Sequence, residues 1–565
     1  MRRLAFDIEA DGLNEVIINK KGHPIPEGKE IFCMVIQNVD NPSEIHRFGP
    51  DHIKDGVQML RDAGLIIGHN IMMYDIPMLE RFFGPIDTPS YDTLIVSRMM
   101  YPDKLDHPLG GNSLECWGKH LGMEKIDFKD FSEYTEEMLT YCVRDVEVTT
   151  KIYNTQKEFV RHYPKSIKLE HILAGIIAKQ IDTGFGFNLE AADELERDLL
   201  MEKVEIEDNL CQIFPPIVEE RWSEKTGKRL KDKVTHFNPA SRQQIAMRLG
   251  EKYGWEPPKT EKGNPKVDSA ELKKLPWDEA KELVKYFDII KLHGMVEDWI
   301  HRATTSRDGR IHGNVNTQGT VTGRMTASQP NLQQVSGDKR ARSLFVPRDG
   351  WKQVGIDASG LEARLLANRM AKWDQGEFGR VVLHEDIHTV NQQKAGLPTR
   401  DSSKTFFYAL IYGAGNDKIG KIIGKGSREG KAIKDRYLEE MPALKKLLAS
   451  CHFQVAKKGT LTLLDGREVP CRSAHKALNV QIQGDGAMIM KVAQTILHNL
   501  LKPYEGSYNF MATVHDEWQL ECKPEIAEDI GLLGVKAIQE AGKRLGCVVD
   551  MDGEYRIGNN WADCH

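Results

Sequence analysis

The sequence contains no long apolar run. None of its 565 residues lies in a stretch near the roughly 18 consecutive apolar positions that a membrane-spanning helix requires. The amino-terminal segment MRRLAFDIEADG carries acidic residues where a secretory signal peptide has its apolar core. The nine cysteines are far apart and form no CxxC pair, which argues against a disulfide framework or a zinc knuckle. These absences favour a reducing, cytoplasmic location without membrane association.

The composition is that of a folded globular protein, and its charge is unevenly distributed. With 40% hydrophobic and 28% charged residues, long disorder, collagen and coiled coil are excluded. The length allows about three or four domains. Residues 1–150 carry 15 Lys/Arg and 26 Asp/Glu, a net of −11, whereas the remainder carries 62 and 57, a net of +5. Two domains with different partners explain this split, and two merely solvated surfaces explain it as well.

Periodicity predicts an α/β region followed by helices. The segments LAFDIEA, IFCMVIQNV and GLIIGHN are typical of strands, and helices are predicted over 130–160 and 167–210. A polar connection follows, and turn residues at 306–316 mark a second boundary before a β-like stretch. The connection contains a basic cluster that is either a solvated loop or a grip on a phosphate backbone: Arg221, Lys225, Lys228, Arg229, Lys231 and Lys233.

The first region contains a set of carboxylates suited to metal binding. Asp7 and Glu9 lie two apart on a predicted strand, so both point to one face. Asp75 follows an apolar run, and Tyr141 and Asp145 lie one helical turn apart. Four carboxylates without a companion His or Cys favour hard cations such as Mg²⁺, which support phosphodiester cleavage. A phenol such as Tyr141 can orient the attacking water.

A second acidic group lies in the second half of the chain. WKQVGIDASGLEARLLANRM is predicted to be a strand that runs into a helix, with Asp357 at the strand end and Glu362 one turn into the helix. YNFMATVHDEWQLEC is predicted to be two strands around a turn that carries His515, Asp516 and Glu517. An acidic turn is usually just exposed. Paired with another strand-end aspartate, it completes a site for phosphoryl transfer.

Between these segments, RDSSKTFFYALIYGAG has a regular spacing of two cations and two aromatics. Arg400, Lys404, Tyr408 and Tyr412 recur every four residues, along one face of a predicted helix. An ordinary amphipathic face has the same pattern, but cations suit a triphosphate and aromatics suit a base or sugar. From residue 400 to 436 there are nine Lys/Arg against four Asp/Glu. This surplus favours a nucleotide or nucleic-acid surface.

The motifs resemble two known families. Those of the first region occur in the order of the DEDD-type 3′–5′ exonucleases, in the tyrosine-containing variant. GIDASGLEAR, RxxxKxxxYxxxYG and VHDE resemble motifs A, B and C of family A (polymerase I-like) DNA polymerases. TVTGRMTASQPNLQQV and HKALNVQIQGDGA resemble two further blocks of that family, so the likeness covers essentially the whole chain. The details, including the terminal NWADCH, are most similar to replicative polymerases of short-tailed bacteriophages.

The resemblance implies a multidomain α/β and α+β protein. A ribonuclease H-like 3′–5′ exonuclease domain is expected first, followed by a right-hand polymerase with thumb, palm and fingers. The palm is expected to consist of two separate segments of the chain. The expected boundaries are 1–185 for the exonuclease domain, 186–310 for a helical thumb, 311–370 for the first palm segment, 371–474 for the fingers and 475–565 for the second palm segment.

For polymerisation, the resemblance implies a template-directed enzyme that adds dNTPs to a primer 3′ end. Asp357 and Asp516 are expected to hold two Mg²⁺ ions, for which Mn²⁺ can substitute, with Ala358 also at the metals and Glu517 in support. Lys404 is expected to bind phosphate and to donate a proton to pyrophosphate. Further phosphate contacts are expected from Arg400 and His388.

For substrate selection, the resemblance makes Glu362 a steric gate against a ribose 2′-hydroxyl. Tyr408 is expected to favour dideoxynucleotide incorporation, and Tyr412 to pack near the templating base. Arg324 and Gln483 are expected to probe minor-groove acceptors of the primer-terminal pair, which test geometry without reading sequence. His515 is also expected to contact DNA. For proofreading, the exonuclease residues are expected to hold a second pair of metal ions.

Two departures from relatives shape the expected partners. The chain begins at the exonuclease strand, so no 5′-nuclease domain is expected, which favours replication over repair. Only about twenty basic, turn-rich residues fill the place of the thumb insertion by which phage relatives capture thioredoxin, so no thioredoxin clamp is expected. Primer-template DNA and dNTPs are the expected partners of a monomer in the host cytoplasm. A phage helicase-primase and a single-strand binding protein are candidate partners.

Two alternatives remain at this point. A non-catalytic DNA-binding or clamp protein could use a degenerate polymerase scaffold, although intact Asp357, Asp516 and Lys404 speak against it. An enzyme that acts chiefly as an exonuclease is the closer alternative. Primer extension with Mg²⁺ and all four dNTPs distinguishes these possibilities.

Overall fold

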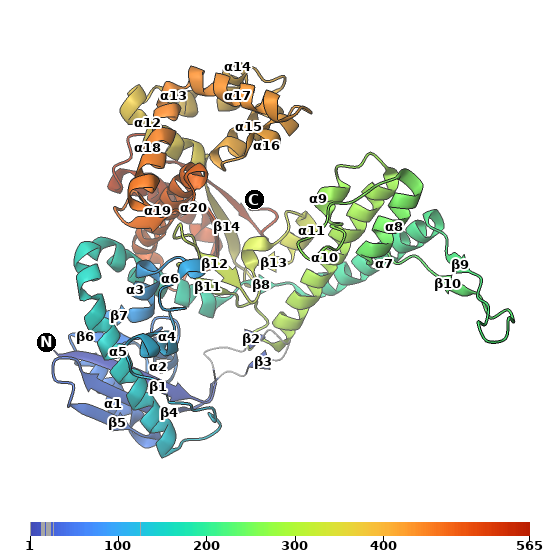
Figure 1. Ribbon diagram of the computed structural model, residues 1–565. Coiled ribbons are helices and arrows are strands. Elements are labelled where there is room, and N and C mark those ends of the chain that lie inside the picture. The colour runs from blue at the N-terminus through green and yellow to red at the C-terminus, as the bar shows by residue number, and fades with distance from the viewer. Residues whose placement is uncertain (1, 13–16, 19–23, 26–27, 125) are drawn as a thin grey trace. The chain divides into compact units, whose positions relative to one another are not determined.

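The computed structural model describes residues 2–12, 17–18, 24–25, 28–124 and 126–565 (Figure 1). The chain divides into two compact units. One comprises Met1–Gly186, Ser306–Gln334 and Val346–His565, and the other comprises Phe187–Thr305 and Val335–Phe345. Residues 335–345 thus belong to the unit that contains the predicted thumb, although the sequence predicts them within the segment 311–370. Among the described helices, none combines the length and apolarity needed to cross a membrane.

The first sheet has five strands in the order β5-β4-β1-β6-β7. The central strand β1 pairs antiparallel with β4 and parallel with β6, so the sheet is mixed. Its strands confirm the three that the sequence predicts in this region. They are β1 (Arg3–Ala10), β4 (Ile31–Asn38), β5 (Ile45–Phe48), β6 (Leu65–Gly68) and β7 (Ser90–Asp92), and a short pair β2 (Ile17–Ile18) and β3 (Pro24–Ile25) precedes β4.

Alternation along β1 explains how helices cover both faces of this sheet. Leu4, Phe6 and Ile8 belong to one buried cluster, whereas Ala5 belongs to another, which packs against the long helix α5. The residues after Ala5 on that second face are Asp7 and Glu9, so alternation directs both carboxylates toward the α5 side. The helices of this region are α1 (Ile53–Arg61), α2 (Asp75–Phe83), α3 (Thr93–Met100), α4 (Leu114–His120), α5 (Glu136–His162) and α6 (Pro164–Thr183).

The continuous helical spacing over 167–210 is divided in the structure. Helix α6 ends at Thr183, and Gly184 follows with a φ of 64°, a left-handed backbone that favours glycine. A second helix, α7, then begins at Leu189, with the Asn188 side chain as its N-cap. The prediction of one continuous helix over 167–210 was therefore wrong at this turn. The helical spacing of apolar residues continues on both sides of the turn, so it does not reveal the break.

The second unit is mainly helical and has its own core. Leu210, Ile245, Leu272 and Leu283 come from four helices and are buried together. A β9–β10 hairpin lies between α7 and α8 in the chain and projects from the helices in Figure 1. The elements of this unit are α7 (Leu189–Ile213), β9 (Ile217–Glu219), β10 (Lys233–Thr235), α8 (Arg242–Tyr253), α9 (Ser269–Leu272), α10 (Asp278–Thr305) and α11 (Lys339–Ser343).

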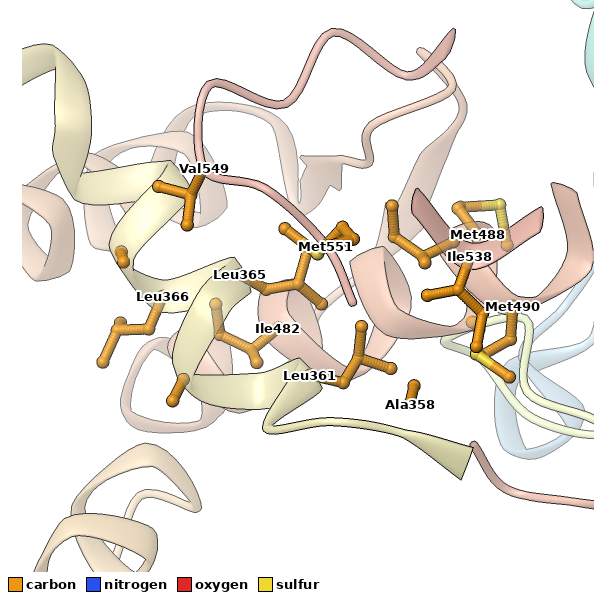
Figure 2. Packing of buried hydrophobic residues seen from close by; sticks show 14 of the residues in the cluster. Ala358, Leu361, Leu365, Leu366, Ile482, Met488, Met490, Ile538, Val549 and Met551 are labelled. Atoms are coloured by element: carbon orange, nitrogen blue, oxygen red, sulfur yellow. The ribbon is translucent and has the colours of Figure 1, made fainter. Parts of the chain in front are cut away.

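The second large sheet is antiparallel, with four strands in the order β17-β18-β14-β19. Its strands come from two distant parts of the chain: β14 (Lys352–Ala358) from one, and β17 (Tyr508–Val514), β18 (Glu517–Cys522) and β19 (Gly553–Gly558) from the other. Figure 2 shows the core beside it, where Ala358 and Leu361 lie near residues of α19 and α20 such as Met490 and Ile538. This core fixes the end of β14 relative to α12, the helix that follows it.

Helices and short strands complete the first unit, and two of the strands, β8 and β13, each include one residue of the second. The short strands are β8 (Gly186–Phe187), β11 (Asn314–Asn316), β12 (Thr326–Ser328), β13 (Phe345–Val346), β15 (Thr460–Thr462) and β16 (Glu468–Pro470). The helices are α12 (Leu361–Asp374), α13 (Glu377–His384), α14 (Ile387–Ala395), α15 (Arg400–Ile411), α16 (Asn416–Lys421), α17 (Ser427–Glu440), α18 (Pro442–Lys458), α19 (Ala477–Leu500) and α20 (Ala527–Arg544).

Candidate active sites

The four-stranded sheet brings Asp357 and Asp516 together. Asp357 lies near the end of β14, and its register partner on β18 is Glu517. The backbone N–H of Ala358 donates to the carbonyl of Asp516 over 3.0 Å, which ties the strand end to the β17–β18 turn. Within that turn, His515 has a left-handed φ of 54°. The two predicted metal-binding aspartates therefore lie together at one end of the strands of this sheet.

The acidic surroundings of Asp357 suit a cation. Burial raises the pKa of Asp357 to about 7, with further contributions from the negative charges of Asp516, Glu517 and Glu554. These groups supply only carboxylate oxygens, the donors that hard divalent cations prefer. A divalent cation would relieve this mutual repulsion, so the residues present fit the metal that the sequence predicts.

Glu517 has partners that its sequence position does not reveal. Its carboxylate is buried and accepts hydrogen bonds from Trp561 Nε1 at 2.8 Å and from His565 Nδ1 at 3.0 Å. Gln519 also donates to it. The carboxyl-terminal residues Trp561 and His565 thus hold the carboxylate of Glu517.

Helix α15 presents the predicted cation–aromatic face. Thr399 and Ser402 form a capping box at its start, and Phe406 and Phe407 are buried behind the face. Lys404 is exposed and Tyr408 is half-buried. Tyr412 lies just beyond the last helical residue, Ile411, as the C-cap, so the predicted helix ends one residue short of it.

Arg400 and His388 are connected through an acidic residue that sequence reasoning missed. Arg400 donates to both carboxylate oxygens of Asp386, at 2.6 and 3.1 Å. Asp386 is the N-cap of α14 and accepts from the backbone N–H of His388 at 3.1 Å. The Arg400 contact holds the pKa of Asp386 well below its ordinary value. The His388 ring centroid lies 6.1 Å from that of Tyr408.

Glu362 connects the remaining predicted nucleotide residues. Tyr412 donates to its Oε1 atom at 2.8 Å, and Gln483 on α19 donates to the same atom at 3.1 Å. Arg324 lies between β11 and β12, and its positive charge contributes to lowering the pKa of His515, after burial. Arg324, His515 and Asp516 line one small cavity. The structure therefore brings these predicted residues to the same region as Asp357.

The five-stranded sheet brings the exonuclease-type residues together. Potential ligand atoms of Asp7, Glu9 and Cys142 all lie within 4.8 Å of one another. Asp75 is the first residue of α2, and its Oδ1 accepts from the backbone N–H of Ile8 at 3.2 Å. Burial raises the pKa of Asp75 to about 7. This oxygen-rich group also fits a hard cation.

Helix α5 carries the other two predicted residues of this site. Tyr141 and Asp145 are both buried, and the Tyr141 ring packs against Phe128 and Phe131. The expectation that no Cys accompanies these carboxylates was wrong, because Cys142 Sγ lies 3.7 Å from Asp7 Oδ2. The sequence did contain a signal for Cys142. It lies three residues before Asp145, and residues three apart share one face of a helix.

Comparison with known proteins identifies the family. The sequence pattern of DNA polymerase family A matches residues 218–563. A DNA-directed DNA polymerase of Enterobacteria phage T3 is 30% identical, covering 100% of both chains. One of Escherichia phage T7 is 31% identical over 89% of this chain and 93% of its own. The chain therefore belongs to DNA polymerase family A and is a DNA-directed DNA polymerase, related to phage replicative enzymes.

A solved structure agrees with this assignment at the level of the fold. It is described as the POL domain of Pol1 from M. smegmatis in complex with DNA primer-template and dNTP. The match has a TM-score of 0.79 and covers 99% of this chain and 96% of that one, at 18% identity. The expected multidomain α/β fold is thus confirmed, and the enzyme belongs to a metal-dependent family.

Proposed function

We propose that this polymerase extends a DNA primer at the site of Asp357 and Asp516 and removes 3′-terminal nucleotides at a separate site. The second site consists of Asp7, Glu9, Asp75 and Asp145. The observation that carries the proposal is the presence of two groups of carboxylates, each at a strand of its own sheet. Mg²⁺ is the proposed ion in both, and Mn²⁺ is the expected substitute.

At the polymerase site, Asp357 and Asp516 would hold the metal together with the backbone of Ala358. When bound, a pair of such ions activates the primer hydroxyl and neutralises the leaving pyrophosphate. Lys404 is exposed on α15 and is proposed to bind the triphosphate and to donate a proton to pyrophosphate. Arg400 would join it by exchanging Asp386 for phosphate, because both are anionic partners of a guanidinium.

Substrate and primer are proposed to be selected around Glu362. Its carboxylate, held by Tyr412 and Gln483, would exclude a ribose 2′-hydroxyl, which makes deoxynucleotides the substrates. Tyr408 would face the sugar, and Tyr412 the templating base. Arg324, Gln483 and His515 would contact the primer-template duplex, where minor-groove acceptors occupy similar places in all correct pairs.

At the exonuclease site, the four carboxylates would hold the ions, and Tyr141 would orient the attacking water. Tyr141 is buried against Phe128 and Phe131, which restricts its ring. A restricted phenol positions a water at little entropic cost. Cys142 is a neighbour of Asp7 and has no assigned part in this step.

Primer extension and degradation with Mg²⁺, assayed in parallel, test the two-site proposal. Asp357→Ala should abolish extension with all four dNTPs and spare degradation of the primer without dNTPs. Asp7→Ala combined with Glu9→Ala should do the reverse. Loss of both activities in either variant would contradict the model. Glu158→Ala is a matched control, because Glu158 is an exposed acid on α5 away from Asp145.

A further inference from the structure

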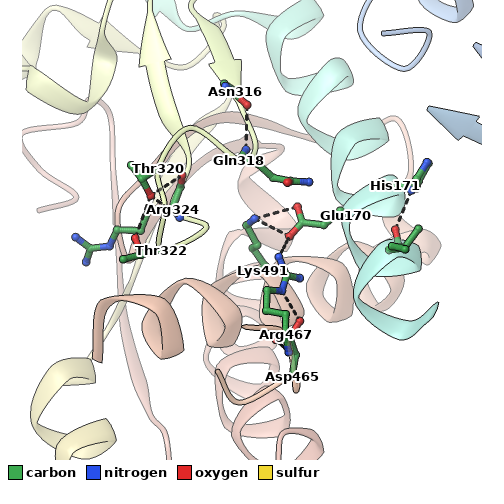
Figure 3. Close-up of polar contacts among 11 residues, drawn as sticks. Glu170, His171, Asn316, Gln318, Thr320, Thr322, Arg324, Asp465, Arg467 and Lys491 are labelled. Atoms are coloured by element: carbon green, nitrogen blue, oxygen red, sulfur yellow. Dashed lines mark hydrogen bonds and ion pairs between the residues drawn. The ribbon is translucent and has the colours of Figure 1, made fainter. Parts of the chain in front are cut away.

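Helix α6 carries two adjacent polar residues that bind different parts of the first unit (Figure 3). The carboxylate of Glu170 is fully buried and accepts from Lys491 Nζ at 2.8 and 2.9 Å. It also accepts from Arg467 Nη1 at 2.7 Å, and Arg467 Nε donates to Asp465 at 2.7 Å. Two carboxylates and two cationic side chains thus balance in charge. The pair of Glu170 and Lys491 joins α6 to α19.

A second contact ties α6 to the sheet of the polymerase site. The Thr513 hydroxyl donates to Gln180 Oε1 at 2.8 Å and accepts from Gln494 at 3.1 Å. Thr513 lies on β17, two residues before His515. Residues of the predicted fingers and second palm segment (371–565) therefore contact α6 at both Glu170 and Gln180. These two positions are about 15 Å apart along the helix at the helical rise per residue.

His171, next to Glu170, instead contacts strand β7 of the five-stranded sheet. Its Nδ1 atom lies 2.8 Å from the carbonyl of Ile167 one turn earlier. Its Nε2 accepts from the backbone N–H of Asp92 at 2.8 Å. An accepting nitrogen carries no proton, so the ring is neutral and Nδ1–H donates to the carbonyl. Burial also lowers the pKa of His171, which maintains this form.

Asp92 in turn binds the backbone of the segment that precedes Asp75. Its carboxylate accepts from the backbone N–H groups of Asn70 at 2.9 Å and Met72 at 3.1 Å. The same carboxylate is the N-cap of α3. Asn70 has a φ of 74°, a left-handed backbone that asparagine tolerates, and the Asp92 carboxylate fixes the backbone N–H groups on this turn. A series of contacts thus runs from His171 through Asp92 to the start of α2, where Asp75 lies.

We propose that His171 is a positioning residue of the exonuclease site and that Glu170 anchors it to the polymerase part of the chain. The inference rests on the proposed exonuclease function and adds a residue to it. Neither side chain is among the expected ligands, and each acts through a neighbour. Ligand groups must be held to within roughly 0.5 Å, so loss of such support weakens a metal site without removing a ligand.

The first experiment compares His171→Leu with His171→Gln in single-turnover hydrolysis of single-stranded DNA. Leucine cannot accept from Asp92, and we expect a rate about 10- to 100-fold lower and a higher Mg²⁺ requirement. Glutamine offers an acceptor oxygen and should retain most of the rate. His162→Leu is the matched control, because His162 also bonds a carbonyl of its own helix but is exposed.

Binding of Mn²⁺ provides a readout that does not depend on activity. In a background with Asp357→Ala and Asp516→Ala, His171→Leu should weaken Mn²⁺ binding measured by titration, and His171→Gln should restore it. Primer extension by each His171 variant in the otherwise unchanged enzyme verifies that it has folded. The inference is overturned if His171→Leu changes neither the hydrolysis rate of the otherwise unchanged enzyme nor the Mn²⁺ affinity of the Asp357→Ala, Asp516→Ala background.

The second experiment tests the anchor from the polymerase side. Lys491→Gln leaves an unbalanced buried charge beside Glu170, and we expect slower hydrolysis of single-stranded DNA although Lys491 lies on α19. Adding Glu170→Gln restores the charge balance and should recover the rate. Unchanged hydrolysis in Lys491→Gln would overturn the anchor. An unmodified enzyme that fails to degrade DNA would instead refute the proposed function itself.

Discussion

Tyr412 donates its phenolic proton to Glu362 across 2.8 Å, joining the end of α15 to the first turn of α12. Burial and the adjacent carboxylate raise the pKa of Tyr412 to about 12, so the phenol remains a donor at neutral pH. Gln483 holds the same carboxylate oxygen from α19. Two separate elements therefore fix the orientation of Glu362.

This contact predicts graded effects on sugar selection. Tyr412→Phe removes one of the two donors, and Glu362→Ala removes the carboxylate that we propose as the gate. A hydrogen bond to a charged group contributes up to about 3 kcal/mol, and less at a half-exposed site. We therefore expect a several-fold loss of discrimination against ribonucleotides for Tyr412→Phe and a larger loss for Glu362→Ala. Single-nucleotide insertion of dCTP and CTP measures it, and unchanged discrimination in Tyr412→Phe contradicts the role given to this contact.

Tyr408 predicts efficient use of dideoxynucleotides. A phenol beside the sugar can replace the hydrogen bond that is lost when the 3′-hydroxyl is absent. Tyr408→Phe should therefore restore discrimination, measured as the ratio of chain termination to extension. Tyr437→Phe is the control, because the Tyr437 hydroxyl donates to Asn391 within the buried core. Equal selectivity in the enzyme and in Tyr408→Phe would refute the prediction.

Trp561 is predicted to stabilise the polymerase sheet through Glu517. Trp561→Phe removes the donor at 2.8 Å from a buried carboxylate, which costs about 1–3 kcal/mol. Calorimetry should show a lower unfolding temperature. Combining it with Glu517→Gln should reduce the penalty, because no buried charge is then left short of a donor. Trp222→Phe is the control, since Trp222 is 58% exposed; an equal decrease there would contradict the explanation.

The β9–β10 hairpin allows the two interpretations of the basic segment to be separated. Its strands pair in the register Val218 with Val234, and a further bridge joins Trp222 to Arg229 nearer the turn, so Arg221 and Lys231 lie between these two pairings. If the hairpin binds DNA, replacing four basic residues by Gln lowers the slope of log Kd against log salt by up to about 3.6. The four are Arg221, Lys225, Lys228 and Lys231.

A matched control uses four lysines of the same unit that already pair with carboxylates. Their replacement should change the slope less, because those charges are partly neutralised. They are Lys252, Lys274, Lys281 and Lys285. Equal slopes for the hairpin variant and the unchanged enzyme would indicate that the hairpin is a solvated loop.

The same hairpin underlies the prediction about thioredoxin. The segment between α7 and α8 contains the short strands β9 and β10 and the turn that joins them. We expect the length of primer-extension products to be the same with and without added thioredoxin. Marked lengthening would show that a clamp binds despite the short segment.

Local pattern predicted most of the strands and helices that carry the two candidate sites, but not the helices α2, α14 and α19. Alternation on one strand placed Asp7 and Glu9 on the same face, and four-residue spacing placed Arg400, Lys404 and Tyr408 on one side of α15. The strand-to-helix transition after Asp357 was also predicted correctly. These features depend on neighbours a few residues away, which periodicity reports directly.

Only the tertiary structure decided which distant groups those side chains meet. Glu517 is held by Trp561 and His565, Arg400 by Asp386, and Glu170 pairs with Lys491, a residue 321 positions away. Such partners leave no periodic signal, because any of many charged or polar residues along the chain could complete them. The sequence determined the chemistry available at each site, and the packing of helices and sheets determined which groups support it.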